Sequence, residues 1–225
     1  MKKLFTILAL ICLFNMSAQI STGGTNNSGT YSSAIGFQTS AVGDYSTAMG
    51  YNTTSSASYC TAMGYATTAS GSTSTAMGVS TTASGDGSTA MGNQTEASGN
   101  NSTSMGANTI ASGSNSTAMG VGTTASGSAS TALGLSTTAS GANSTSTGFG
   151  TTASGNRSTA MGVNTTASDY GSLVIGQYNS SGSAITTSST AFNTSNTAFV
   201  IGNGTLGNLS DAFKVMFNGD ASVSN

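Results

Sequence analysis

A large apolar residue recurs every 14 residues along most of this chain, and a glycine always follows it. In the unit Thr75-Ala76-Met77-Gly78, Thr75 and Met77 fall on one face of an extended strand and Ala76 on the other, because side chains alternate along a strand. Ten of eleven units carry a large apolar residue at the Met77 position, which predicts a core column. The predicted core column contains Ile35, Met49, Met63, Met77, Met91, Met105, Met119, Leu133, Met161 and Ile175.

Each unit also contains a second strand signal, as in Thr81-Thr82-Ala83, where the branched threonine side chains favour extended backbone. Two short strands closed by glycine-containing turns would make one coil of a β-roll. Glycine at this frequency argues against a helix. The glycines predicted to make the turns are Gly36, Gly50, Gly64, Gly78, Gly92, Gly106, Gly120, Gly134, Gly148, Gly162 and Gly176.

The unbroken period favours an all-β solenoid over a low-complexity linker, because a linker has no physical reason to keep phase through eleven units. Coils stacked in register place like residues above like, so the methionines form an apolar ladder and the threonines and serines form hydroxyl ladders. One coil buries little apolar surface against the entropy of ordering it. We therefore expect several rolls to associate side by side and to bury the alanine columns.

The N-terminus has the composition of a secretory signal peptide. Lys2 and Lys3 precede an apolar run that is too short to span a bilayer, and small residues follow at a cleavage site. We predict a signal peptide over residues 1–18 with cleavage after Ala18, and no membrane span in the mature chain. Residues 19–30, rich in Gly, Ser, Thr and Asn, are predicted to be a flexible leader.

The remaining sequence divides into a repeat region and a different C-terminal segment. Residues 31–183 are predicted to form the β-roll. Residues 184–225 contain an alternating stretch, 211–217, and the tight-turn signal Asn218-Gly219. We predict a short β cap or connector over this segment, since a solenoid would otherwise expose a sheet edge.

Charged residues make up only 4% of the chain, and histidine is absent. The abundant hydroxyl groups therefore lack a candidate base, and we predict neither an enzyme nor a cofactor. Asp44 and Asp86 share a repeat position three coils apart, so no metal site is predicted. No basic patch exists, so binding to nucleic acid is not expected.

Cys60 is the one cysteine outside the predicted signal peptide, and it occupies a position that serine holds in other units. The favoured interpretation is a small residue replacing serine. The alternative is a disulfide between subunits, which a single copy per chain permits.

The segments Ser33-Ala34-Ile35-Gly36 and Ser172-Leu173-Val174-Ile175-Gly176 carry a family resemblance. The 14-residue unit resembles the YadA-like head of the trimeric autotransporter adhesins, with its haemagglutinin-type repeats. That resemblance implies a left-handed parallel β-roll, three chains wound side by side, and display outside a bacterial cell, secreted or associated with the outer membrane. The implied role is attachment to host matrix, to cells or to other bacteria.

The sequence departs from the family pattern in two respects. Threonine stands at the position that is often valine in the family, and methionine replaces isoleucine in the next apolar column, which softens the packing. No sustained heptads follow Ser183. Anchoring through the coiled-coil stalk and β-barrel of that family is therefore not expected.

Two other functions remain open at this point. Paired hydroxyls such as Thr81-Thr82 could order water on an ice-binding face, although adjacent side chains point to opposite faces of a strand. A passive surface spacer is the third interpretation. The candidate partner-binding residues are Phe37, Tyr51 and Tyr65, an aromatic cluster near the N-terminal end of the repeats.

Overall fold

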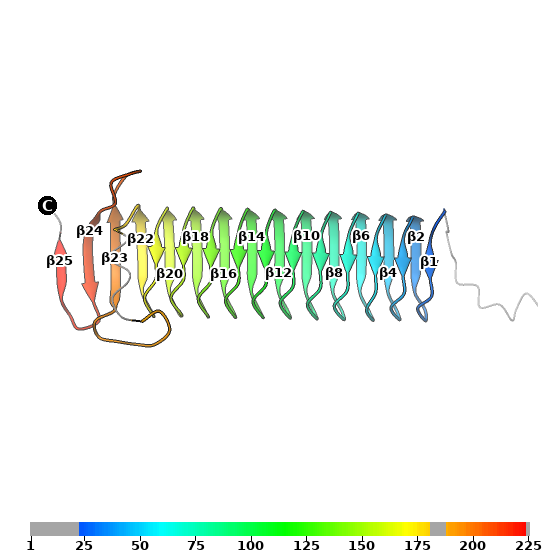
Figure 1. Cartoon of the computed structure of the whole chain (residues 1–225), viewed down its shortest axis with the longest axis horizontal. Helices are drawn as coiled ribbons and strands as arrows, with labels where there is room; N and C mark the ends of the chain where they lie inside the picture. The colour runs from blue at the N-terminus through cyan, green and yellow to red at the C-terminus, as the bar shows by residue number, and fades with distance from the viewer. Residues whose placement is uncertain (1–22, 181–187, 224–225) are drawn as a thin grey trace, which may run out of the picture.

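The computed structural model describes residues 23–180 and 188–223 and shows a long stack of two-stranded coils (Figure 1). Every element in these residues is a β-strand. Parallel neighbours build two sheets that run the length of the stack. The predicted all-β parallel solenoid with 14-residue coils is therefore confirmed. No helix long and apolar enough to cross a membrane occurs in the described part of the chain.

The first sheet has 14 strands, and its repeat strands are five residues long. These repeat strands are β2 (Ser33–Phe37), β4 (Thr47–Tyr51), β6 (Thr61–Tyr65), β8 (Thr75–Val79), β10 (Thr89–Asn93), β12 (Thr103–Ala107), β14 (Thr117–Val121), β16 (Thr131–Leu135), β18 (Thr145–Phe149), β20 (Thr159–Val163) and β22 (Leu173–Gln177). The sheet ends with β23 (Thr197–Asn203), β24 (Asp211–Met216) and β25 (Ala221–Val223).

The second sheet has 11 strands of two residues each. They are β1 (Asn26–Asn27), β3 (Ser40–Ala41), β5 (Thr54–Ser55), β7 (Thr68–Ala69), β9 (Thr82–Ala83), β11 (Glu96–Ala97), β13 (Ile110–Ala111), β15 (Thr124–Ala125), β17 (Thr138–Ala139), β19 (Thr152–Ala153) and β21 (Thr166–Ala167). We refer to the outer surfaces of the two sheets as the long-strand face and the short-strand face.

Each strand pairs in parallel with the equivalent strand of the next coil, so identical positions lie directly above one another. Met77 pairs with Met91, and Gly78 pairs with Gly92. In the second sheet, Ala83 pairs with Ala97 in the same way. The ladders of like residues predicted from the period are therefore present.

The interior of a coil is lined by small side chains. In one representative coil, Ser74, Ala76, Thr81 and Ala83 point inward and are 0% exposed. A closed path of 14 residues encloses only a narrow space, which methyl and hydroxymethyl groups can fill without voids. The stacked alanines of both sheets consequently form the hydrophobic core.

The methionine column lies on the long-strand face and does not fill the interior of the coil. Most of its members are half-buried, and Met119 and Met161 are 39% and 44% exposed. The alanine columns, which were expected to be covered by neighbouring rolls, are already covered within one chain. The sequence interpretation therefore assigned the wrong face to the interior. Alternation defines two faces, but the narrowness of the coil decides that the smaller side chains go inside.

Buried hydroxyl groups are the unusual feature of this interior. The inward threonines and serines of most coils, Thr81 among them, have no hydrogen-bond partner for the side-chain oxygen among the described residues. Two coils differ because serine replaces the inward alanine of the long strand. There the hydroxyls of Ser104 and Thr109 lie 2.7 Å apart, and those of Ser146 and Thr151 also lie 2.7 Å apart.

The ladder begins earlier than the sequence suggested. Asn26 and Asn27 form β1 and pair in parallel with Ser40 and Ala41, within the segment 19–30 that was predicted to be a flexible leader. The described part of that segment therefore belongs to the first coil. The predicted signal peptide, residues 1–18, lies outside the described residues.

The C-terminal segment forms the predicted β cap. Strand β23 pairs in parallel with β22, with Gly202 opposite Gly176, and this adds one further level to the sheet. Strands β24 and β25 then continue the sheet in antiparallel pairing. The turn between them contains Asn218 and Gly219, as the sequence indicated.

A side chain continues the hydrogen-bonding of the last short strand. Asn179 Oδ1 accepts the backbone N–H of Thr166 at 2.7 Å, and Asn179 Nδ2 donates to the Thr166 carbonyl at 3.1 Å. The amide group therefore takes the place of a further strand beside β21. This satisfies backbone groups that the end of a sheet would leave unpaired.

Two valine substitutions should affect stability in opposite directions. Thr81→Val removes a buried hydroxyl that has no partner, so we expect unfolding free energy to rise by about 1 kcal/mol. Thr109→Val leaves the Ser104 hydroxyl without its partner, so we expect a loss of about 1–2 kcal/mol. Urea and thermal unfolding followed by circular dichroism would measure both. Equal effects of the two substitutions would contradict this account of the interior.

Candidate functional site

The long-strand face presents three outward columns, represented by Thr75, Met77 and Val79 of β8. The first two are half-buried in the single chain and Val79 is exposed. Other members of the Val79 column, such as Val121 and Leu135, are also exposed. Apolar side chains recur at most levels of the second and third columns, and exposed apolar surface that repeats in this way is typical of interaction sites. The three columns of this face contain no charged residue.

The anchor glycines lie within the long strands, so their prediction as turn residues is wrong. Each has a positive φ, for example 124° at Gly78 and 126° at Gly50. A Cβ atom on Gly78 would lie 2.0 Å from the carbonyl oxygen of Gly92. Glycine is therefore required for the close approach of successive coils as well as for its backbone conformation. The turns themselves use other residues with positive φ, such as Ser80 and Gln94.

The predicted aromatic cluster is present as a stack on the long-strand face. We call Phe37, Tyr51 and Tyr65 the strand-end ladder, because each occupies the last position of its strand. Ring centroids are 5.4 Å and 5.2 Å apart, and the rings are nearly parallel. Each side chain is between 44% and 54% exposed. The ladder borders the methionine column and remains open to water.

A second aromatic stack lies at the turn that leads into the same strands. We call Tyr31, Tyr45 and Tyr59 the turn ladder; its ring centroids are 5.3 Å and 5.0 Å apart. These three side chains are between 50% and 78% exposed. The turn ladder was not among the candidates predicted from the sequence. The 14-residue spacing of the three tyrosines is the signal that could have revealed it.

Backbone strain distinguishes the turn ladder from the strand-end ladder. Tyr31, Tyr45 and Tyr59 have φ values of 54°, 57° and 60°, a conformation that large side chains rarely adopt. Equivalent positions in later coils include Gly87 and Asn101, residue types that accept this conformation readily.

Arg157 occupies the same turn position near the C-terminal end of the repeats. Its guanidinium lies 5.3 Å from the centre of the Tyr170 ring, and it donates a hydrogen bond to the Tyr170 hydroxyl. This cation–π contact pairs the two side chains within one chain.

The short-strand face carries a different pattern, which consists of two hydroxyl columns. Thr82 and Ser84 both point outward, whereas the adjacent Thr81 points inward. The paired threonines therefore lie on opposite faces, as expected. The outward threonines are Thr54, Thr68, Thr82, Thr124, Thr138, Thr152 and Thr166; the outward serines are Ser56, Ser70, Ser84, Ser98, Ser112, Ser126, Ser140, Ser154 and Ser168.

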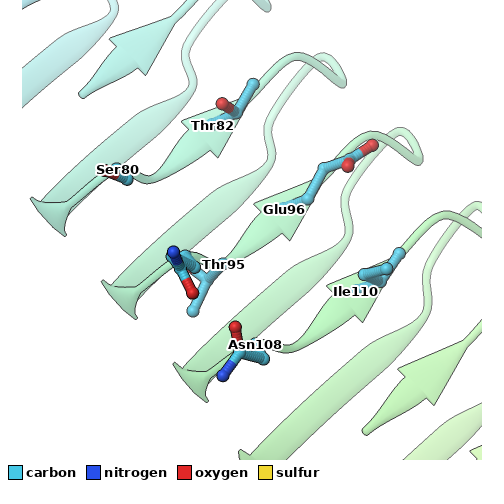
Figure 2. Close-up of a pocket in the computed structure, with 7 residues that line it drawn as sticks. Ser80, Thr82, Thr95, Glu96, Asn108 and Ile110 are labelled. Carbon is cyan, nitrogen blue, oxygen red and sulfur yellow. The ribbon is translucent and has the colours of Figure 1, made fainter. Parts of the chain in front are cut away.

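Glu96 and Ile110 interrupt the threonine column. Both project from neighbouring short strands beside a shallow hollow (Figure 2). The hollow is lined by Ser80, Thr82, Gln94, Thr95, Glu96, Asn108 and Ile110. Glu96 is the one charged residue in the two outward columns of this face.

Two aspartates at equivalent turns, Asp44 and Asp86, have structural roles. The carboxylates of Asp44 and Asp86 accept the backbone N–H groups of Thr30 and Ser72, at 2.8 Å and 2.9 Å, and so connect each turn to the preceding coil. Within residues 23–180 and 188–223, no three His, Cys, Asp or Glu side chains come together as a metal site would require.

Cys60 is 0% exposed and belongs to the interior of a coil. Its thiol contacts the carbonyl oxygen of Ala57 at 2.8 Å, in the manner of an inward serine. A disulfide between subunits would require the coil to open, so the structure supports the interpretation of Cys60 as a serine replacement.

Comparison with known protein families gives a match over most of the repeat region. The family model described as YadA head domain repeat (2 copies) matches residues 28–53, 61–81, 69–95, 83–109, 97–123, 111–137, 125–151 and 153–179. No curated protein matches the chain.

Replacing glycine by alanine should affect stability differently at a strand position and at a turn position. Gly78→Ala places a Cβ against backbone in a strand with positive φ, and we expect a loss of at least about 2 kcal/mol or failure to fold. Gly87→Ala should cost only about 1 kcal/mol, the usual cost of a non-glycine residue at positive φ. The added Cβ would meet a flexible side chain, that of Asn101, and Ala129 and Thr73 already occupy equivalent positions. Thermal unfolding would compare them, and similar losses at both sites would contradict the assignment.

Proposed function

The chain belongs to the YadA head domain repeat family, and on that premise we propose that it is a non-catalytic, adhesin-type head assembled from three chains. The proposal includes export from the cell and display on the bacterial surface or as a secreted module, with attachment to matrix, to cells or to other bacteria as its role. Family membership supports the adhesin type. The assembly and the surface that makes contact are argued below from the two faces of the solenoid.

The apolar long-strand face is the observation that carries the proposed assembly. Burying one large apolar side chain contributes about 1.5–3 kcal/mol, and the methionine column repeats such a side chain at nearly every level. Because the three columns of this face contain no charge, packing copies against it leaves no unpaired ion buried. We propose that the column from Ile35 to Ile175 is a core column between chains.

Methionine also suits this location chemically. Its unbranched, polarizable side chain adapts to irregular gaps, so three identical columns can pack around a common axis without precise complementarity. The outward Thr75 column beside it contributes methyl groups on the same face. In such an assembly the three short-strand faces point away from the axis.

A charge on the long-strand face should dissociate the assembly. Light scattering after size exclusion should give the parent protein three times the mass of one chain. Met91→Glu with Met105→Glu should reduce this to one chain, because six carboxylates would converge near the axis, while circular dichroism stays unchanged. Thr138→Glu is the control, since it adds a carboxylate to the column that Glu96 already occupies and lies three coils away from Glu96. A parent protein that is a monomer would overturn the proposed assembly.

We propose that the outward short-strand face makes the adhesive contact, at the hollow beside Glu96 and Ile110. There a carboxylate, an exposed apolar side chain and the amides of Gln94 and Asn108 gather on an otherwise uniform surface. Binding sites are concave and combine apolar surface with a few polar groups. The hollow has this combination, and it supports the contact.

Replacing Glu96 and Ile110 by threonine, the residue found in most other coils, should reduce adhesion. Particles coated with the Glu96→Thr, Ile110→Thr double variant should attach to immobilised matrix protein or to cells several-fold less than particles coated with the parent protein. Thr138→Ser with Thr152→Ser changes the same face away from the hollow and should retain attachment. Attachment that is equal for all three proteins would remove the hollow from consideration. If the parent protein also attaches to none of these surfaces, the passive spacer becomes the better interpretation.

The two hydroxyl columns favour ice binding as a second candidate function. Outward Thr82 and Ser84 are two residues apart, about 7 Å along the strand, and repeat about every 4.8 Å between coils. Such a regular, nearly uncharged lattice could hold water in order. The Glu96→Thr, Ile110→Thr variant completes the threonine column, so it should increase thermal hysteresis on this interpretation while it decreases adhesion on the first. Absence of thermal hysteresis in both proteins would exclude ice binding.

A further inference from the structure

The two aromatic ladders occupy the same three coils and lie at opposite ends of the same strands. Tyr31 precedes β2 and Phe37 ends it, and Tyr45 and Tyr51 bracket β4 in the same manner. Tyr59 and Tyr65 then bracket β6. Each of the three levels at the N-terminal end of the stack therefore has one ring at each edge of the long-strand face.

The turn ladder is strained and incompletely covered within one chain. A left-handed backbone conformation costs a non-glycine residue about 1–2 kcal/mol, and three successive coils adopt it with tyrosine. Two ring stacks return about 0.5–1.5 kcal/mol each. The stacking within the chain roughly offsets this strain at best, yet the three rings stay 50–78% exposed. A further contact that covers the rings would account for their placement.

Rotational symmetry supplies such a contact in the proposed three-chain assembly. When three identical chains turn one face toward a common axis parallel to the solenoid, each chain meets the next through opposite edges of that face. A rotation about this axis involves no shift along it, so each coil lies level with the same coil of its neighbour. The turn edge of one chain consequently meets the strand-end edge of the next at every level.

We propose that the turn ladder of one chain packs against the strand-end ladder of the next, so that a second copy of this chain is the partner of Phe37, Tyr51 and Tyr65. Three such aromatic seams would close the N-terminal end of the assembly. The inference rests on the proposed function, because it requires three chains around the long-strand face. It adds which residues meet, and at which end of the head.

The composition of the two columns limits the seam to this end. Beyond the third coil, the turn position holds small or polar residues such as Thr73, Gly87 and Asn101, and the strand-end position continues as Val79 and Asn93. Aromatic residues occur at both edges of one level only in the first three coils of the repeats. Since the paired levels must match, the seam also fixes the axial register of the three chains, which uniform repeats would leave weakly specified.

Cysteine pairs can test which edges meet. In a Cys60→Ser background, the double variant Tyr45→Cys, Tyr51→Cys should form a covalent trimer on mild oxidation, visible on a non-reducing gel. A bond within one chain is excluded, because six residues of extended backbone span about 20 Å and a disulfide requires Cα atoms within about 7 Å. Either substitution alone should give no covalent trimer, since its partner remains tyrosine.

A pair of cysteines placed at different levels of the stack provides the control for axial register. Tyr31→Cys with Tyr65→Cys places the two thiols on the same two edges but two coils apart, about 10 Å along the axis. This pair should not form a covalent trimer. Light scattering of the unoxidised proteins, and of the Cys60→Ser parent, should give three times the mass of one chain in parallel.

The outcomes separate this inference from the proposed function. Suppose that the parent protein and the Tyr45→Cys, Tyr51→Cys variant are both trimers, but the variant does not cross-link. This result overturns the seam and leaves the proposed assembly intact. Covalent dimers from either single variant would also overturn it, because like edges would then meet. A variant that loses the trimer while the parent keeps it supports the seam, since removal of two rings per chain weakens association. A monomeric parent overturns the assembly itself.

Discussion

Successive coils of this protein stack so closely that the backbone of one coil occupies the place where a side chain of the next would begin. At each anchor glycine from Gly36 to Gly148, a Cβ atom would approach the glycine carbonyl of the following coil to between 1.9 and 2.1 Å. The same contact recurs through the stack, and it holds the period at 14 residues without insertion between Gly36 and Gly176. The parallel register, the ladders of like residues and the two flat faces all follow from this stacking.

A second consequence is that the interior is too narrow to provide a conventional core. Alanine, serine and threonine fill it, and most of the inward hydroxyls have no hydrogen-bond partner within the described chain. Such an interior offers less stabilisation than a core of larger residues would, because less apolar surface is buried per residue. The large apolar side chains are placed outside, on the long-strand face. A solenoid built in this way leaves much of its apolar surface outside the coil, which connects its fold to the assembly that we propose.

The two faces and the turns thereby acquire different roles. The long-strand face is apolar and uncharged and suits contact between copies of the chain. The short-strand face carries hydroxyl columns that leave it available to an external surface, and it varies at Glu96 and Ile110. The turns hold the widest range of residues, and the same turn position is occupied by glycine, asparagine, tyrosine and arginine in different coils. Membership of the YadA head domain repeat family is consistent with a head module whose scaffold is constant and whose surface details differ between coils.

The period, the strands, their parallel register and the C-terminal β cap could all be predicted from the sequence. These features follow from the alternation of side chains along each strand and from a repeat that never changes phase. Both patterns can be read directly from the amino-acid sequence. Alternation also separated Thr75 and Met77 from Ala76, but it could not show which side was interior. Only the closed coil decided that, because its narrow cross-section excludes methionine and admits alanine. Tertiary structure likewise moved the glycines from turns into strands, extended the ladder to Asn26, and placed the Asn179 amide beside the last short strand. Each of these depends on contacts between residues at least 13 positions apart along the chain, which local pattern does not contain.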